Sequence, residues 1–421
     1  MDGFVLKGDI CWSESPNEIK AVADGYAACL DGACLGVFQS YPESLALPLV
    51  DMSGKLVIPG MVDLHVHAPQ YPFRGLGLDL ELLEWLGEHT FAEEGKYGDL
   101  EYASRAYKIF VDDLAKGPNT RACVFATVHE ASTLALMDAF EKSGMVAYVG
   151  KVNMDRNCPG NLLEESAEAS LEATKRVIEG SSGYSRVKPM LTPRFVPTCS
   201  DELLRGLGEL SERLGLALQS HLSENKSEIE WVKRLCPWSE SYTDAYWKLG
   251  CLNSRTVMAH CVWCTDFEMD LISKSGAFVA HCPQSNINLS SGVAPITQYM
   301  EAGLNVGLGS DVAGGCHTSM LRAMTDAVQA SKLRWRLFDQ SVRPLRLEEA
   351  FYLATKGGGR FFGKVGSFEP GYEFDAVVLD DSEVKSPFPM NILDRLARAA
   401  YFCDSVSAIC KWARGKRVAG A

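Results

Sequence analysis

Two histidines stand one residue apart at the end of an apolar run, in the stretch VIPGMVDLHVH (57–67). Successive side chains on a β-strand point to opposite faces, so His65 and His67 would point the same way and Val66 the other way. Two imidazoles on one side of a strand can share a metal ion. The spacing therefore predicts part of a metal site at the end of a strand.

Three further strand-like runs end in a side chain of the same chemistry. They are LALQSHLSE with His221, TVMAHC with His260 and VGLGSD with Asp311. In a barrel of parallel strands every carboxyl end opens onto one face, so residues far apart in the sequence converge there. Imidazoles with one carboxylate suit a divalent ion such as zinc, with a position left for a water whose pKa falls to roughly 7. The sequence thus predicts a site that makes hydroxide near neutral pH.

The elements that must position these residues alternate in type. From about residue 58 to 366, apolar runs precede amphipathic stretches, as RACVFATV precedes STLALMDAFEKSG and AYVGKVNM precedes EESAEASLEATKRVIEG. Such alternation is typical of βαβ units around a parallel sheet, and there are enough apolar runs to close an eight-stranded (β/α)8 TIM-like barrel. Residues 1–57 and 367–421 instead resemble strands separated by turns. We expect these two ends to pair into one small β domain.

The composition excludes several classes of protein. With a net charge of −13, the chain has no basic surface for a nucleic-acid backbone. The chain has no uninterrupted run of about 18 apolar residues, and MDGFVLKGDICWSE at the N-terminus does not resemble an export signal. The 14 cysteines are scattered through apolar runs, as reduced and buried thiols are. We therefore expect a cytoplasmic protein without nucleic-acid or membrane partners.

These residues together carry a resemblance to a known family. PGMVDLHVH, the strand-end histidines and the aspartate of GSD resemble the metal-dependent amidohydrolase superfamily over nearly the whole chain. In that superfamily the barrel is joined to a small β-sandwich made from both chain ends. Five longer segments are similar to the guanine deaminase family within it: HVHAPQYPFRGLGLDLELLEWL, KPMLTPRF, QSHLSENKSEIEWVK, HCPQSNINLSSG and GLGSDVAGG.

The resemblance implies an activity, a cofactor and an assembly. The implied reaction is the hydrolytic deamination of guanine to xanthine and ammonia. One zinc ion per chain is implied, although the sequence does not separate zinc from iron. A small-molecule purine substrate and a homodimer are implied in the same way.

The resemblance also implies which residues act at the metal. The implied metal ligands are His65, His67, His221 and Asp311. Glu224 matches the family's proton shuttle, and His260 matches the histidine that orients or polarises groups at the metal. One carboxyl that alternates between acid and base can protonate both a ring nitrogen and the departing ammonia. Asp311 can also take the proton of the attacking water.

Gln70 and Arg194 match the family's substrate contacts. Guanine offers oxygen and nitrogen acceptors beside N–H donors, which a donor-only guanidinium and an amide with both functions can read. Phe195 is expected to cover the face of the ring, and Trp85 is a weaker candidate for the same role.

Three alternatives stay open. The same barrel can deaminate another aminated purine, pyrimidine or triazine, because the pocket rather than the metal ligands sets specificity. A non-enzymatic assembly protein on this scaffold would be expected to lose ligands, whereas this chain keeps them. A two-metal hydrolase of cyclic amides needs a bridging lysine, and Lys188 stands too early in its strand. For the C-x-x-C pair Cys261 and Cys264, without a second such pair, we expect packing rather than metal binding.

Overall fold

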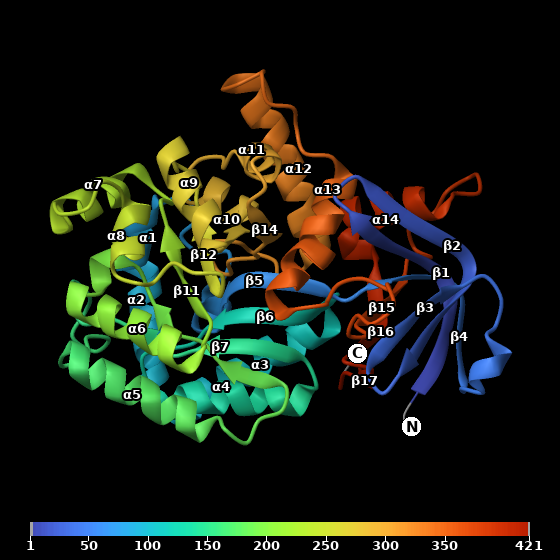
Figure 1. Ribbon diagram of the computed structural model, residues 1–421, viewed down its shortest axis with the longest axis horizontal. Helices are drawn as coiled ribbons and strands as arrows, with labels where there is room; N and C mark the ends of the chain where they lie inside the picture. The colour runs from blue at the N-terminus through green and yellow to red at the C-terminus, as the bar shows by residue number, and fades with distance from the viewer. Residues whose placement is uncertain (1–2, 420–421) are drawn as a thin grey trace.

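The computed structural model describes residues 3–419, which form a barrel with a smaller β unit beside it (Figure 1). The first and last strands of the chain both lie in the β unit, so the chain leaves that unit, builds the barrel and returns (Figure 1).

Eight parallel strands build the barrel in chain order. Their bounds are β5 (Met61–His67), β6 (Asn119–Phe125), β7 (Val146–Gly150), β9 (Val187–Pro189), β11 (Leu218–Leu222), β12 (Thr256–His260), β13 (Phe278–His281) and β14 (Asn305–Leu308). They pair as two sheets, β5-β6-β7-β9 and β11-β12-β13-β14. A parallel bridge between Leu191 and Leu218 joins β9 to β11, and the N–H of Asp311 donates to the carbonyl of His65 at 2.8 Å. The sheets therefore close into the predicted barrel.

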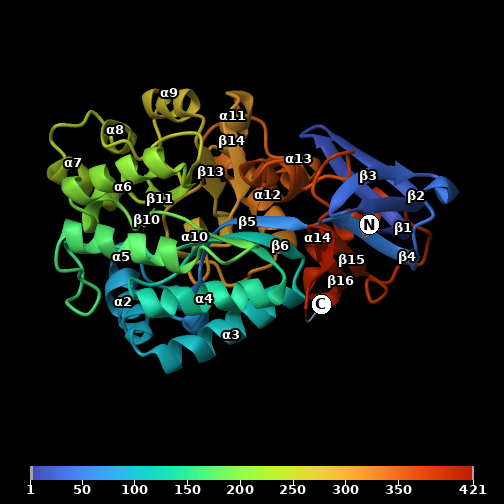
Figure 2. The ribbon, with the colours of Figure 1, turned by 60° about the horizontal axis from the view of Figure 1, so that its bottom comes forward.

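Helices follow most of the strands and cover the outside of the barrel (Figures 1 and 2). Their bounds are α3 (Leu100–Lys116), α4 (Glu130–Ser143), α5 (Ala167–Gly180), α6 (Asp201–Leu214), α7 (Lys226–Leu235), α8 (Tyr242–Lys248), α9 (Asp266–Ser275), α10 (Pro283–Asn288), α11 (Ile296–Glu301), α12 (Met320–Leu337) and α13 (Leu347–Tyr352). Polar caps fix where several begin: Ser200 caps α6, and Asn225 with Glu228 forms a capping box on α7. Gly215 ends α6 with φ of 65°, a conformation that favours glycine.

Short helical segments fill the long connection between β5 and β6. They are η2 (Ala68–Phe73), α1 (Leu82–Trp85), η3 (Leu86–Thr90), α2 (Phe91–Glu94) and η4 (Gly95–Gly98). Their apolar side chains are buried against α3 and the barrel. This connection forms one wall of the barrel mouth.

The inside of the barrel is packed with side chains. Val62, Cys123, Val257 and Phe278 belong to one buried cluster although they come from strands of both sheets. Strands on opposite sides of a barrel meet only across its interior, so this cluster fills the barrel. A ligand site must therefore lie above it, at the carboxyl ends of the strands.

The terminal strands form one seven-stranded sheet. Their bounds are β1 (Gly3–Ser15), β2 (Glu18–Leu30), β3 (Ala33–Phe38), β4 (Leu49–Pro59), β15 (Ala376–Asp380), β16 (Ser407–Ala413) and β17 (Lys416–Arg417). The order is β17-β16-β15-β4-β1-β2-β3, so strands from both ends of the chain share the sheet, and α14 (Ile392–Tyr401) packs against it. The rings of Phe4 on β1 and Trp412 on β16 lie 5.4 Å apart although two strands separate β1 from β16. The expected sandwich therefore takes the form of a sheet that curls around one core.

Buried charged side chains join the two units. Arg121 in β6 donates to both carboxylate oxygens of Asp375, at 2.7 and 2.9 Å. Lys411 in β16 donates to three backbone carbonyls at and just beyond the end of α3, at 3.1, 3.1 and 2.6 Å. Both contacts use polar groups whose burial without a partner would cost free energy.

The described residues include all 14 cysteines, and among these residues no disulfide is formed, as the sequence predicted. Among the helices of residues 3–419, none has the length and apolar character needed to span a membrane.

Candidate active site

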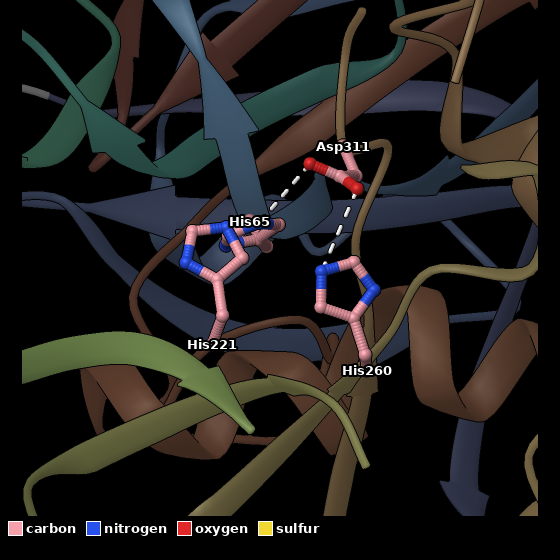
Figure 3. Close-up of side chains that lie close together, drawn as sticks. All are labelled: His65, His221, His260 and Asp311. Carbon is pink, nitrogen blue, oxygen red and sulfur yellow. Dashed lines mark ion pairs between the residues drawn. The ribbon is translucent and has the colours of Figure 1, made fainter. Parts of the chain in front are cut away.

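Four histidines and one aspartate meet at the carboxyl ends of the barrel strands. His65 and His67 lie in β5, His221 in β11 and His260 in β12, and Asp311 follows β14. One ligand atom from each of His65, His221, His260 and Asp311 lies within 4.8 Å of the other three, and all four residues are grouped in Figure 3.

His67 completes this cluster. Its Nε2 lies 3.2 Å from Nε2 of His65, 3.1 Å from Nε2 of His221 and 3.4 Å from Oδ1 of Asp311. The expectation that His65 and His67 point the same way is thereby confirmed. The four side chains that the resemblance implied as metal ligands converge on one point of the barrel mouth.

Burial keeps these imidazoles neutral. Burial lowers the pKa of His65, and together with the neighbouring imidazoles it lowers the pKa of His67 and His221 well below the usual value. Burial alone would raise the pKa of Asp311, but the surrounding imidazoles, His65 foremost, hold that pKa below its usual value. Neutral imidazoles and an ionised carboxylate are the forms in which these groups bind metals.

Contacts on the far ring nitrogen orient two of the imidazoles. Nδ1 of His221 lies 2.6 Å from the carbonyl oxygen of Arg194, and Nδ1 of His260 lies 2.8 Å from Oδ1 of Asn286. Each contact places a proton on Nδ1 and leaves the lone pair of Nε2 toward the cluster. Within the described chain, the buried Nε2 of His260 forms no hydrogen bond.

The backbone is strained where the cluster is built. His260 has φ of 72° and Asp311 has φ of 46°, values that residues with a Cβ rarely adopt. The buried carboxylate of Asp63 accepts hydrogen bonds from the N–H groups of His65 and Ser310, at 3.1 and 3.0 Å. Asp63 therefore ties β5 to the segment that carries Asp311.

Glu224 lies beside the cluster, with one oxygen hydrogen-bonded and the other close to His260. Its Oε1 accepts from Oγ of Ser291 at 3.0 Å, and its Oε2 lies 3.3 Å from Nε2 of His260. Its backbone N–H donates to Oε2 of Glu228 at 3.0 Å. Burial, reinforced by the charge of Asp311, raises the pKa of Glu224 well above the usual value. The carboxyl of Glu224 therefore keeps its proton to a higher pH than an exposed glutamate does.

A cavity of about 390 Å³, counting its open mouth, adjoins the cluster. Gln70, Arg194, Phe195, Glu224 and Trp85 line it. The structure thus brings every substrate contact suggested by the sequence to one cavity, and their roles stay predictions.

Four polar residues of the site were not found from the sequence. Glu94 bridges Gln70 and Arg194, Ser291 and Glu228 hold Glu224, and Asn286 orients His260. Only Glu228 carries a local signal, the capping-box spacing from Asn225, and that signal concerns the start of a helix. The other three residues act across chain separations that no short pattern spans.

Lys188 and the C-x-x-C pair lie as the sequence suggested. Lys188 in β9 is exposed and does not line the cavity. Cys261 is buried in the core, where burial raises the pKa of its thiol well above the usual value, and Cys264 packs against the same core. The predicted packing role of the pair is confirmed.

A (β/α)8 barrel with a buried His and Asp cluster at the carboxyl ends of its strands defines a metal-dependent hydrolase. Residues 56–418 match the amidohydrolase family. The chain belongs to this family.

Several guanine deaminases are similar to this chain over most of their length. A guanine deaminase of Dictyostelium discoideum is 43% identical over 345 residues, which cover 81% of this chain and 76% of that protein. The human guanine deaminase is 40% identical over 79% of this chain and 74% of its own. The crystal structure of a guanine deaminase from C. acetobutylicum with guanine bound in the active site superposes with a TM-score of 0.95. That structure is 41% identical and covers 99% of this chain and 100% of its own.

Proposed function

We propose that this protein is a guanine deaminase, which hydrolyses guanine to xanthine and ammonia. The observation that carries this function is the cavity that joins the His and Asp cluster, Glu224, Gln70 and Arg194. The similarity to guanine deaminases from several organisms, one solved with guanine in its active site, supports the same substrate.

We propose that His65, His67, His221 and Asp311 hold the metal. The fit is supported by imidazole nitrogens that lie 3.1 and 3.2 Å apart, and by the carboxylate oxygen beside them. Nitrogen donors with one carboxylate suit zinc, and they also suit iron, so zinc is our first choice of metal. When bound, such a cation supplies Lewis acidity and makes a water acidic enough to attack near neutral pH.

Glu224 is proposed to carry the protons of the reaction. Hydrolysis at the amine-bearing carbon needs one proton on the adjacent ring nitrogen and a second on the departing ammonia. The buried carboxyl of Glu224 can give the first and then take the proton that the attacking water loses. It gives that proton to the departing amine and regains its own from the hydroxyl group on the attacked carbon as xanthine forms. Asp311 is a second acceptor for the water's proton, and the lone pair of Nε2 of His260 faces the same region.

Gln70 and Arg194 are proposed to orient guanine, and Phe195 to cover its ring. Arg194 offers only donors and Gln70 offers both functions, which suits the oxygen and ring nitrogens of guanine. Phe195 and Trp85 add apolar surface to the same cavity. A flat bicyclic ring suits a cavity lined by two aromatic side chains and two polar side chains that can bind its edge.

The direct test is xanthine and ammonia release from guanine by the metal-loaded protein. Related aminated purines, pyrimidines and triazines are assayed beside guanine. Glu224→Gln keeps the shape of the side chain but cannot shuttle a proton, so we expect kcat to fall roughly a hundredfold or more. No turnover of guanine alongside turnover of another ring would reject the substrate, and full activity of Glu224→Gln would reject the proton shuttle.

We further propose a division of the chain into residues 1–57, 58–366 and 367–421, where the first and third parts form the β unit. The shared seven-stranded sheet supports this, although residues 1, 2, 420 and 421 lie outside the described residues. A cytoplasmic location, supported by described cysteines that form no disulfide, and a homodimer are also proposed. Light scattering of the purified protein tests the dimer.

A further inference from the structure

Glu94 is a buried carboxylate behind the cavity. It ends α2 in the wall between β5 and β6, and only 3% of its surface is exposed. Its Oε1 accepts from Nε2 of Gln70 at 2.9 Å, and its Oε2 accepts from Nη1 of Arg194 at 2.5 Å. Gln70 and Arg194 line the cavity, whereas Glu94 does not. Glu94 therefore contacts both proposed substrate-binding residues, Gln70 and Arg194, from the side away from the ligand.

These contacts fix which way the amide of Gln70 faces. Its Oε1 accepts the backbone N–H of Ala313 at 3.1 Å, and Glu94 takes one hydrogen of Nε2. An amide without these partners can turn over and exchange its donor and acceptor. With a carboxylate on one side and a backbone N–H on the other, one orientation is favoured, and the second hydrogen of Nε2 is left for a ligand.

Glu94 also fixes the guanidinium of Arg194. One nitrogen is bound to Glu94, and the guanidinium carbon lies 5.2 Å from the centre of the Phe91 ring. Within residues 3–419 the guanidinium forms no hydrogen bond other than the one to Glu94, although the side chain is nearly buried. Its remaining N–H groups are thus available to acceptor atoms in the cavity.

We infer that Glu94 is a positioning residue that makes this pocket selective for purines with an oxygen at C6. A carboxylate only accepts hydrogen bonds, so Gln70 and Arg194 must each donate an N–H group to Glu94. The N–H groups that remain on both side chains are left for the ligand. A carbonyl oxygen at C6 satisfies those donors, whereas hydrogen or an amino group at the same position leaves buried donors unpaired, which is costly. This inference rests on the proposed function, in which Gln70 and Arg194 contact the purine.

The test compares two purines that lack the reactive amine. Hypoxanthine has the oxygen at C6, whereas unsubstituted purine has only hydrogen there. Calorimetry on the metal-loaded protein gives their dissociation constants. In Glu94→Gln we expect hypoxanthine to bind about tenfold more weakly, on the scale of one charged hydrogen bond, and purine to change much less. Equal weakening of both probes, or no change in either, would overturn the inference.

Kinetics with guanine give a second readout. Because Glu94 does not touch the reacting atoms, KM for guanine should rise about tenfold in Glu94→Gln, with kcat changed far less. A fall in kcat at unchanged KM would contradict a role of Glu94 in positioning Gln70 and Arg194. The metal content of the variant must equal that of the wild type.

A matched control removes another buried ion pair. Lys151 and Glu164 lie 2.5 Å apart, are largely buried and do not line the cavity. Glu164→Gln should lower the free energy of unfolding while leaving the preference for hypoxanthine over purine unchanged. A loss of that preference in Glu164→Gln would mean that general destabilisation explains the effect of Glu94→Gln.

A second variant keeps the test decisive if Glu94→Gln does not fold. Glu94→Asp retains the charge, but its side chain is one methylene shorter. It therefore cannot reach both Gln70 and Arg194 in their present positions. We expect weaker binding of hypoxanthine and little change for purine, and parallel behaviour of the two probes would overturn the inference. Failure of the wild type to deaminate guanine would reject the proposed function instead, while the two binding constants would still decide the role of Glu94.

Discussion

Glu224, the residue proposed to carry protons, is positioned by one residue four positions away and by one from a distant part of the chain. Ser291 donates to one of its oxygens at 3.0 Å, and Glu228 accepts its backbone N–H at 3.0 Å. The first contact restricts the rotation of the carboxyl group, and the second restricts its backbone. At the scale of single residues, the reactivity of the site depends on such supports as much as on the residues that react.

Ser291→Ala tests this support. Removal of the hydroxyl frees the carboxyl of Glu224 to rotate, so kcat for xanthine formation should fall roughly tenfold, the scale of one hydrogen bond to a charged group. KM and the bound metal should stay as in the wild type, because Ser291 does not line the cavity. Steady-state kinetics and metal analysis check both points, and an unchanged kcat would contradict the positioning role.

At the scale of elements, strand β16 of the terminal unit secures a helix of the barrel. Lys411 in β16 donates to the backbone carbonyls of Leu114 in the last turn of α3, Gly117 just after the helix and Asn119 at the start of β6. Burial lowers the pKa of Lys411 to about 7. One lysine thus links the two units through a helix end and adds a dependence of stability on pH.

The sign of that dependence follows from proton counting. Between pH 7 and about 10, the unfolded chain keeps the lysine proton while the folded chain has lost it, so the free energy of unfolding rises with pH. The slope is at most about 1.4 kcal/mol per pH unit. Urea titrations of wild type and Lys411→Met at several pH values should show this rise in the wild type relative to the variant. A constant difference across pH 7–10 would contradict the lowered pKa.

At the scale of the whole molecule, the metal cluster joins the two halves of the barrel. His65 and His67 belong to one four-stranded sheet, whereas His221, His260 and the strand before Asp311 belong to the other. The halves otherwise meet at two seams, marked by the bridge of Leu191 with Leu218 and the bond from Asp311 to His65. A cation bound by both halves would therefore stabilise the entire fold.

Metal removal tests this link. A cation that binds only the folded state stabilises it by mass action, so stripping with a chelator should lower Tm by at least about 5 °C, and added zinc should restore it. Differential scanning calorimetry measures the shift, and elemental analysis should give one ion per chain. Loss of the metal with an unchanged Tm, or two ions per chain, would contradict the proposed site.

The sequence predicted the parts of this protein that depend on local periodicity. The alternation of apolar runs with amphipathic stretches predicted the barrel, and the H-x-H spacing predicted that His65 and His67 face the same way. The strand-end positions of His221, His260 and Asp311 followed from the rule that parallel strands share one active face. The shared sheet of the two chain ends was also expected, although its order and its curl were not.

Only the tertiary structure decided which polar groups support the active residues. Glu94 lies 24 residues from Gln70 and 100 from Arg194, and Ser291 lies 67 from Glu224, yet each pair is in contact. No periodic pattern links residues at such separations, because their contact depends on how whole strands and loops pack around the barrel mouth. The sequence by itself predicted the barrel and the residues that we propose to react, because strand ends and residue types can be recognised from local patterns. Their orientation and their pKa values arise from burial and from partners that meet only after the barrel has closed.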